Sequence, residues 1–237
     1  MVLMFRGIKS PIFVALDVDE KSKALEVAKQ VEPYVGGFKV GPRLCMKYGG
    51  DLVKELSELG HVFVDNKYFD IPNTMEHAIR ATFRAGATFA TVHAQSGTEA
   101  LKRLAQVERE LNRERPFRIL VVTILTSFDQ KGLPPTSNAI EIPEQVDLLA
   151  QLAMDSGLSG LVCSPHEVQR VKNHHPGAFV VTPGIRLREG DQGDQKRIMG
   201  PREAMQSGAT ALVVGRPIVD AENPAVAAER FFSEAQI

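Results

Sequence analysis

The stretch His61-Val62-Phe63-Val64-Asp65-Asn66-Lys67-Tyr68-Phe69-Asp70-Ile71-Pro72-Asn73-Thr74 contains the unit from which the rest of the fold can be predicted. Its first four residues form an apolar run typical of a buried strand, and helical spacing of apolar residues follows from Met75 to Ala85. Between the two elements, two carboxylates and one ammonium stand within six residues. Burying such a cluster is costly, so we expect it to serve a chemical purpose at the end of the strand.

The same unit of strand, polar end and helix recurs along the whole chain. With residues 61–65, the predicted apolar strands cover 11–16, 38–41, 88–93, 117–125, 160–164, 178–182 and 210–214. Predicted helices cover 24–31, 51–59, 75–85, 97–109, 144–156, 165–173, 201–207 and 224–235, with Asp19 expected to cap the first and Asn73 and Glu76 to form a capping box on the third.

This alternation predicts parallel βαβ units, and continuous apolar strands indicate a sheet that is buried on both faces. An open doubly wound sheet is the alternative, but no strand runs directly into a dinucleotide-type glycine fingerprint. We therefore predict an α/β protein, a (β/α)8 TIM barrel, with residues 1–237 forming a single catalytic domain.

Composition narrows the class of protein. The 237 residues carry 28 basic and 29 acidic side chains, so the charge pattern favours neither a nucleic-acid binder nor a polybasic membrane protein. Apolar runs stay well short of a membrane span, and the first residues lack the long apolar region of a signal peptide. Cys45 and Cys163 are expected to be a pair of reduced core residues, which indicates a cytoplasmic protein.

In a parallel barrel the active site lies at the carboxyl ends of the strands. Every predicted strand here ends in a polar residue; in chain order these are Asp17, Lys39, Asp65 with Lys67, His93, Thr126, Ser164, Arg186 and Arg216. Chance would leave some of these ends apolar, so the pattern favours an enzyme over an inert scaffold.

The last two strand ends have the composition of a phosphate site. Gly215 allows a ligand to approach the backbone, Arg216 offers a fork of donors, and Pro217 is suited to begin a short helix. Arg186 and Gln195, on the glycine-rich loop after the seventh strand, are expected to close over the phosphate. The alternative is that Arg216 is a surface residue and the loop is merely solvated.

Asp17, Lys39, Asp65 and Lys67 are expected to form a charged cluster in the barrel mouth, since alternate residues of a strand point to the same side. A purely structural ion-pair network is the alternative. A metal site is less favoured, because the ammonium of Lys67 competes for the carboxylates that a hard cation needs. His93 is expected to be a hydrogen-bonded wall residue, whereas Thr126 is equally suited to bind a planar heterocycle and to cap the next turn.

At these residues the chain resembles the orotidine 5′-phosphate decarboxylase family along nearly its whole length. The matching blocks are Leu16-Asp17-Val18, Phe38-Lys39-Val40-Gly41, Asp65-x-Lys67-x-x-Asp70-Ile71-Pro72-Asn73-Thr74, Val122-Thr123-Ile124-Leu125-Thr126-Ser127, Thr182-Pro183-Gly184-Ile185-Arg186, Asp194-Gln195-Lys196-Arg197 and Val213-Val214-Gly215-Arg216-Pro217-Ile218. The Asp-x-Lys-x-x-Asp block alone is less specific, because it also resembles metal-dependent sugar-phosphate decarboxylases and hexulose-phosphate synthases.

The resemblance implies decarboxylation of orotidine 5′-monophosphate to uridine 5′-monophosphate, the last step of pyrimidine synthesis, without metal or cofactor. It implies that Lys67 protonates the ring carbon within an array completed by Asp65, Asp70 and Lys39. For the substrate it implies contacts from Asp17 and Lys39 to the ribose, from Thr126 and Pro183 to the pyrimidine, and from Arg186, Gln195, Gly215 and Arg216 to the phosphate.

The resemblance further implies a homodimer in which Asp70, Ile71 and Thr74 reach the active site of the other subunit. Members of the family often have an aliphatic residue after the first aspartate and a histidine just before the second. Here Asn66 and Phe69 occupy those positions, which puts the packing around the shared site in question but leaves the motif residues intact. A non-catalytic barrel that binds a phosphate ligand is the remaining alternative of a different class.

Overall fold

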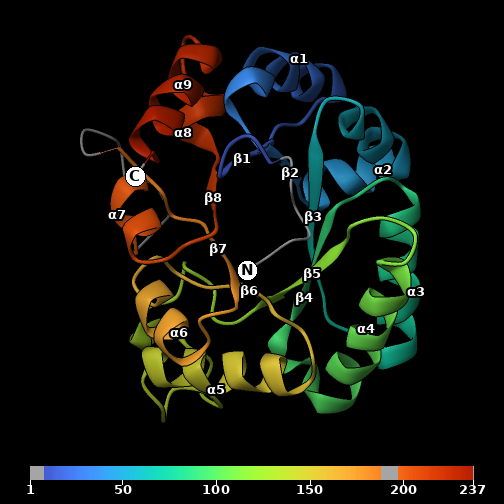
Figure 1. Cartoon of the computed structure of the whole chain (residues 1–237), viewed down its shortest axis with the longest axis vertical. Coiled ribbons are helices and arrows are strands. Elements are labelled where there is room, and N and C mark those ends of the chain that lie inside the picture. Colours follow the sequence, from blue (N-terminus) through green and yellow to red (C-terminus); the bar gives the residue numbers. More distant parts are fainter. Residues whose placement is uncertain (1–7, 188–196, 237) are drawn as a thin grey trace.

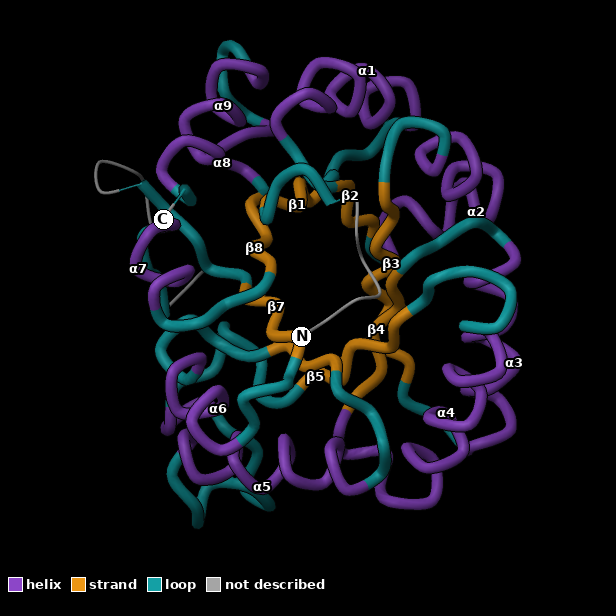
Figure 2. Tube along the Cα trace, in the orientation of Figure 1, coloured by secondary structure: helices purple, strands orange, loops and turns teal. Residues whose placement is uncertain are grey.

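The computed structural model describes residues 8–187 and 197–236, and eight parallel strands close into a barrel surrounded by helices (Figures 1 and 2). The ring closes because β1 pairs with β8, with Ile12 opposite Leu212. The strands are β1 Ile12–Ala15, β2 Gly37–Val40, β3 His61–Tyr68, β4 Phe89–His93, β5 Arg118–Val122, β6 Gly160–Val162, β7 Phe179–Thr182 and β8 Ala211–Val214. The predicted (β/α)8 barrel is confirmed.

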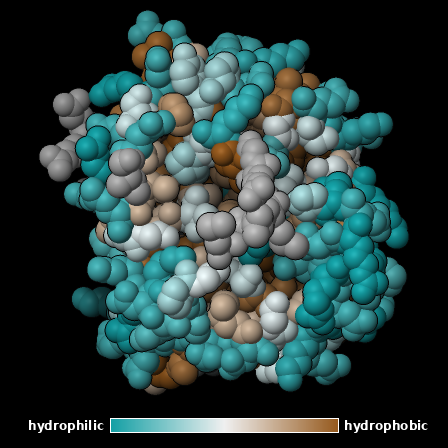
Figure 3. Space-filling model, in the orientation of Figure 1, coloured by the Kyte–Doolittle hydropathy of each residue, from teal (hydrophilic) through white to brown (hydrophobic). Residues whose placement is uncertain are grey.

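The helices lie outside this ring, and the surface in Figure 3 is mostly hydrophilic over them. They are α1 Lys21–Val31, α2 Pro42–Ser57, α3 Pro72–Arg84, α4 Gly97–Leu111, α5 Ile142–Asp155, α6 Val168–His174, α7 Pro201–Gln206, α8 Arg216–Val219 and α9 Pro224–Glu234, with short 3-10 turns at Glu32–Tyr34, Ala94–Ser96 and Gln130–Gly132. Within the described residues, none of these helices combines the length and apolarity needed to cross a membrane.

The sequence missed the first part of α2 and the last part of β3. Helix α2 consists of two helical segments separated by the non-helical Gly49, at φ 55° and ψ −143°; the second segment is the helix expected near Asp51, and the first, from Pro42, was not predicted. Strand β3 continues to Tyr68 instead of ending at Asp65, with an irregular register between Val64 and Tyr68. Asp65 and Lys67 therefore lie within the strand, whereas Asp70 follows it.

Both expected helix caps are also wrong, because distant arginines bind the side chains concerned. Glu20 is the residue preceding α1, while the carboxylate of Asp19 accepts hydrogen bonds from Arg43 at 2.7 and 2.5 Å. Ile71 is the residue preceding α3, while Asn73 accepts a hydrogen bond from Arg103 at 3.1 Å and Glu76 binds the same guanidinium at 2.6 Å.

The apolar interior is divided into two layers. A large layer fills the space between the strands and the helices. A smaller cluster fills the barrel itself and consists of Phe13, Ala15, Phe63, Phe89, Leu120, Phe179, Val181, Ala211 and Val213. Within it the ring of Phe89 lies 5.5 Å from that of Phe13, edge to face, and 5.7 Å from that of Phe179, stacked.

Close packing of the strands depends on glycine where neighbouring backbones meet. A Cβ atom on Gly37 would stand 2.1 Å from the carbonyl oxygen of His61, and one on Gly160 would stand 2.4 Å from that of Ile119. Glycine at these positions therefore lets β2 approach β3 and β6 approach β5. The same spacing aligns the strand ends that carry the polar residues.

Candidate active site

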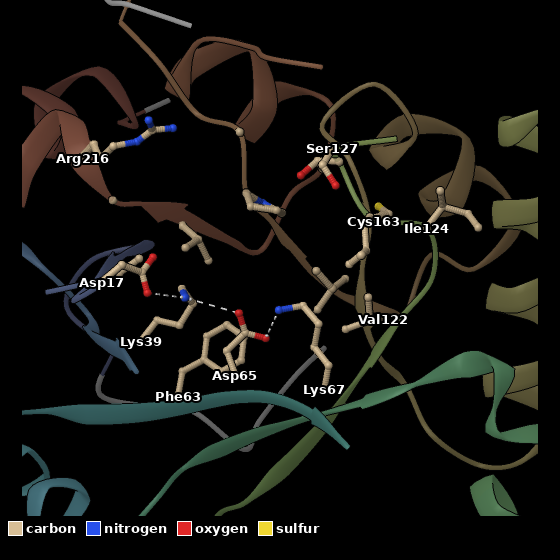
Figure 4. Close-up of a pocket in the computed structure, with 18 of the residues that line it drawn as sticks. Asp17, Lys39, Phe63, Asp65, Lys67, Val122, Ile124, Ser127, Cys163 and Arg216 are labelled. Carbon is tan, nitrogen blue, oxygen red and sulfur yellow. Dashed lines mark hydrogen bonds and ion pairs between the residues drawn. The ribbon is translucent and has the colours of Figure 1, made fainter. Parts of the chain in front are cut away.

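Strands β1 to β3 place four charged side chains in a row at the carboxyl ends of the barrel (Figure 4). The Nζ atom of Lys39 lies 3.4 Å from Oδ1 of Asp17 and 3.3 Å from Oδ2 of Asp65. The Nζ atom of Lys67 lies 3.0 Å from Oδ1 of the same Asp65. The charges alternate in sign along the row, as the sequence predicted, and each ammonium faces a carboxylate.

An apolar floor lies directly beneath this row because side chains alternate along a strand. Phe63 precedes Asp65 by two residues and Ala15 precedes Asp17 by two, and both side chains belong to the apolar cluster inside the barrel. The side chains of Lys39 and Asp65 are only 12% and 13% exposed, whereas that of Lys67 is 37% exposed. The inner charges therefore experience little solvent screening, and the outer ammonium remains accessible to a ligand.

Electrostatics keep Lys39 charged in this position. Burial by itself would lower the pKa of its ammonium, but the neighbouring carboxylates of Asp65 and Asp17 outweigh burial and hold that pKa above its ordinary value. Lys39 is therefore a permanent cation at neutral pH, fixed between two acceptors. Such a group can orient a ligand without needing to change its protonation state.

The backbone of Lys67 is unusual. Its φ angle is 47°, and within residues 8–187 and 197–236 it is the one non-glycine residue with a positive φ. This left-handed conformation is uncommon for a side-chain-bearing residue and clusters at functional sites. It accompanies the irregular register of β3, which allows Asp65 and Lys67 to face each other at 3.0 Å.

The row of charges forms one wall of a cavity of about 620 Å³, within the usual range for small-molecule sites. Its lining includes the predicted residues Asp17, Lys39, Asp65, Lys67, Thr126, Pro183, Arg186, Gly215 and Arg216. Figure 4 shows Arg216 across the cavity from Lys67. The short helix expected to begin at Pro217 is present as α8 and begins one residue earlier, at Arg216, directly after Gly215. The side chain of Arg186 is buried, and its Nη1 donates to the carbonyl of Ile185 at 2.9 Å.

Three predicted residues lie apart from this cavity, and a fourth lies outside the described residues. Asp70, Ile71 and Thr74 are exposed on the connection from β3 to α3 and at the start of that helix, and Oδ1 of Asp70 accepts a hydrogen bond from the backbone of Ile71 at 2.7 Å. Gln195 falls in the segment 188–196, which the structure does not describe.

Strand β4 contributes two polar residues with different roles. His93 packs its ring 5.8 Å from that of exposed Phe69, and its Nδ1 accepts a hydrogen bond from the backbone of Gln95 at 3.3 Å. The expected hydrogen bond of His93 is therefore present, although His93 does not line the cavity. Burial, and then the charge of Lys67, lowers the pKa of His93. Thr91, which the sequence analysis did not single out, is fully buried beneath Lys67 and hydrogen-bonded to it.

Two arginines outside the predicted set fasten the loops around the cavity. Arg43 lines it, donates to the carbonyl of Asp17 at 2.7 Å and, by hydrogen bonding, holds the pKa of Asp19 below its ordinary value. Arg197 pairs with the buried Glu167 at 2.6 Å and donates to the carbonyl of Leu125 at 3.1 Å, which joins the loops after β5 and β6. Their sequence signal is weak, because each partner is at least 24 residues away in the chain.

The described residues hold no second reactive centre formed by an activated thiol or a metal-binding cluster. Cys45 is half-buried and Cys163 is buried, and both are free thiols, as expected. Burial raises the pKa of each thiol, so neither is an activated nucleophile. In the part of the chain that the structure describes, His, Cys, Asp and Glu side chains do not gather in groups of three that could hold a metal ion.

A closed barrel with an ionic array over an apolar floor and cations across the cavity defines an enzyme of the (β/α)8-barrel class. Residues 10–231 match the model of the orotidine 5′-phosphate decarboxylase / HUMPS family. The chain is 42% identical over 220 residues to an orotidine 5′-phosphate decarboxylase of Dictyoglomus thermophilum, covering 90% of each chain. It is 40% identical over 236 residues to that of Moorella thermoacetica, covering 97% of this chain and 93% of the relative.

Among solved structures, the crystal structure of orotidine 5′-phosphate decarboxylase from Lactobacillus acidophilus superimposes with a TM-score of 0.83 at 32% sequence identity, covering 97% of this chain and 100% of that one. The chain belongs to the orotidine 5′-phosphate decarboxylase / HUMPS family. The resemblance noted in the sequence is thereby confirmed.

Proposed function

We propose that this enzyme decarboxylates orotidine 5′-monophosphate to uridine 5′-monophosphate and carbon dioxide, the last step of de novo pyrimidine biosynthesis, without metal or cofactor. The observation that carries the proposal is the alternating row from Asp17 to Lys67 above an apolar floor. Decarboxylation of a pyrimidine ring leaves an electron pair on carbon with no cofactor to delocalise it. A fixed ammonium in a poorly screened site is the group that stabilises such a charge.

In the proposed step the bond between the ring carbon and the carboxylate breaks, and the electron pair stays on that ring carbon. A proton from Nζ of Lys67 then forms the new carbon–hydrogen bond, and the neutral amine regains a proton from water. Asp65 holds the ammonium in place at 3.0 Å, and Lys39 fixes the other oxygen of Asp65 at 3.3 Å. Lys67 is therefore the proton donor, with Asp65, Lys39 and the partner's copy of Asp70 completing the array.

The substrate is proposed to span the cavity from this array to the arginines. All four of Asp17, Lys39, Thr126 and Pro183 line the cavity. Asp17 and Lys39 are assigned to bind the ribose hydroxyls, and Thr126 and Pro183 to contact the pyrimidine. The phosphate is assigned to Arg186, Arg216 and the backbone at Gly215, together with Gln195 of the segment that the structure does not describe. Because the phosphate lies far from the reacting carbon, its binding energy is available for loop closure and for lowering the barrier.

The donor set supports chemistry without a metal. One carboxylate oxygen of Asp65 faces Nζ of Lys67 and the other faces Nζ of Lys39. A hard cation would have to displace one of these ammonium groups to gain an oxygen ligand. The metal-dependent sugar-phosphate lyases that share the Asp-x-Lys-x-x-Asp block are thus the less favoured alternative.

The function is tested by following the loss of orotate-ring absorbance when purified protein meets orotidine 5′-monophosphate in a strong chelator. Turnover that persists in chelator is the expected result. Activity that disappears with the chelator would indicate a metal-dependent lyase instead. Binding of uridine 5′-monophosphate without any turnover would indicate a non-catalytic binding barrel.

We further propose a homodimer in which Asp70, Ile71 and Thr74 complete the partner's site. In support, these residues are exposed, and the side chains of Phe69 and Ile71 on the same connection are 62% and 66% exposed. Exposed large apolar side chains close together in the sequence at the rim of a site are typical of a contact surface. The proposal includes residues 1–237 acting as one catalytic domain in the cytoplasm, where the two free thiols would stay reduced.

A further inference from the structure

Thr91 lies at the centre of strand β4, directly behind the Asp65–Lys67 pair. Its side chain is fully buried. Its Oγ1 atom lies 2.9 Å from the backbone nitrogen of Lys67 and 3.0 Å from Oδ1 of Asp65. One hydroxyl thus contacts both members of the pair that the proposed chemistry uses.

The directions of these two hydrogen bonds are fixed by chemistry. The backbone N–H of Lys67 can only donate, so Oγ1 of Thr91 accepts there. The carboxylate of Asp65 can only accept when it is ionised, so the hydroxyl proton of Thr91 points to Oδ1. The same Oδ1 receives the ammonium of Lys67 at 3.0 Å. Thr91 therefore fixes Oδ1 of Asp65, the same oxygen that orients the ammonium of Lys67.

The register of the strands explains why a side chain is needed here. Val64 pairs with Ala90 and Tyr68 with Val92, so three residues of β3 lie opposite the single residue Thr91. Such a bulge interrupts the regular ladder and leaves backbone groups to find other partners. The backbone N–H of Lys67 donates a hydrogen bond to the Thr91 hydroxyl. In this conformation Lys67 has a left-handed φ of 47°.

We propose that Thr91 is a positioning residue that fixes both the backbone of Lys67 and the carboxylate of Asp65, and so aims the ammonium at the reacting carbon. This inference rests on the proposed function for its kinetic consequence. Thr91 does not line the cavity and does not touch the substrate; it acts through the two charged residues. A displacement of about 1 Å at a reacting group is enough to reduce the rate about a hundredfold.

Thr91→Val tests the hydroxyl, because valine keeps the shape of threonine and removes only the donor and acceptor. Thr91→Ser keeps the hydroxyl and removes the methyl group. Thr123→Val is the matched control, because Thr123 is equally buried and its hydroxyl binds the carbonyl of Val162 at 2.9 Å, away from the charged row. Thr91→Ala replaces the valine variant if the latter does not fold.

In Thr91→Val we expect kcat to fall about a hundredfold with KM for orotidine 5′-monophosphate changed less than about threefold. Thr91→Ser and Thr123→Val should keep kcat within about threefold of wild type. Without any substrate, the Lys67 amide should exchange its hydrogen at least about tenfold faster in Thr91→Val than in wild type or Thr123→Val.

Unchanged kcat in Thr91→Val would overturn the proposal, as would an equal loss in Thr91→Ser, since the methyl group would then be responsible. Full protection of the Lys67 amide in Thr91→Val would overturn it as well. If the wild-type protein does not turn over orotidine 5′-monophosphate, the proposed function fails. The exchange measurement still decides in that case whether Thr91 holds Lys67.

Discussion

Replacing Lys39 by methionine should destabilise the folded protein, because the change removes one charge from a buried pair and leaves the other. At an effective dielectric constant near 20, charges 3.3 Å apart, the separation of Nζ from Oδ2 of Asp65, attract by about 5 kcal/mol. The contact with Asp17 contributes less, since that side chain is 55% exposed and screened by water. The cost of dehydrating both partners offsets part of this attraction.

Breaking a buried ion pair by removing one partner costs about 3–5 kcal/mol. Asp65 keeps Lys67 at 3.0 Å and the Thr91 hydroxyl at 3.0 Å, so we expect Lys39→Met to lower the free energy of unfolding by about 3 kcal/mol, the lower end of that range. Urea unfolding followed by far-ultraviolet circular dichroism measures this, since the chain contains no tryptophan. All variants should be compared at one protein concentration, because dimerisation would make stability depend on it.

Lys23→Met is the control, because Lys23 pairs with Glu26 on the surface and is 48% exposed; its loss should cost less than about 1 kcal/mol. The reasoning is refuted if Lys39→Met unfolds no more easily than Lys23→Met.

Two other predictions concern pH and assembly. Burial raises the pKa of Glu108 to about 7, so the folded state binds a proton more tightly than the unfolded chain and loses about 3 kcal/mol as pH rises from about 4.5 to 7. Urea unfolding of Glu108→Gln should lack that loss, and parallel pH profiles for the two proteins would contradict the prediction. Lys67→Ala and Asp70→Ala should each be nearly inactive, but subunit exchange in an equal mixture should restore about a quarter of wild-type activity, because half the dimers then carry one intact site. If activity does not return although subunits demonstrably exchange, the shared site is wrong.

Much of the fold was predictable because alternation is strict in a parallel barrel. Every apolar strand ended in a polar residue, which was enough to expect Asp17, Lys39, Asp65 and Lys67 in one mouth, and the structure brings them together. Helix boundaries were less predictable, because local signals competed with distant partners. Asp19 and Asn73 have the side chains of helix caps but bind arginines from other elements instead.

The parts of the site that could not be predicted depend on register and long-range contact. Thr91 is β-branched and suits any strand, so the sequence does not distinguish it from a purely structural residue. Its role depends on the bulge, which places its hydroxyl behind Lys67. Arg43 lies in the first turn of a helix expected to begin later, although Gly41 followed by Pro42 is a recognisable helix start. Arg197 binds Glu167, which is 30 residues away in the chain.

The role of the Lys67 ammonium is tested most directly by the turnover of orotidine 5′-monophosphate by Lys67→Ala in the presence of a chelator. In the proposed mechanism, alanine removes both the positive charge beside the reacting carbon and the proton that this carbon receives. We predict that kcat falls about a thousandfold or more, while calorimetry still detects binding of uridine 5′-monophosphate through the phosphate end of the cavity. Turnover by Lys67→Ala at the wild-type rate would contradict the account.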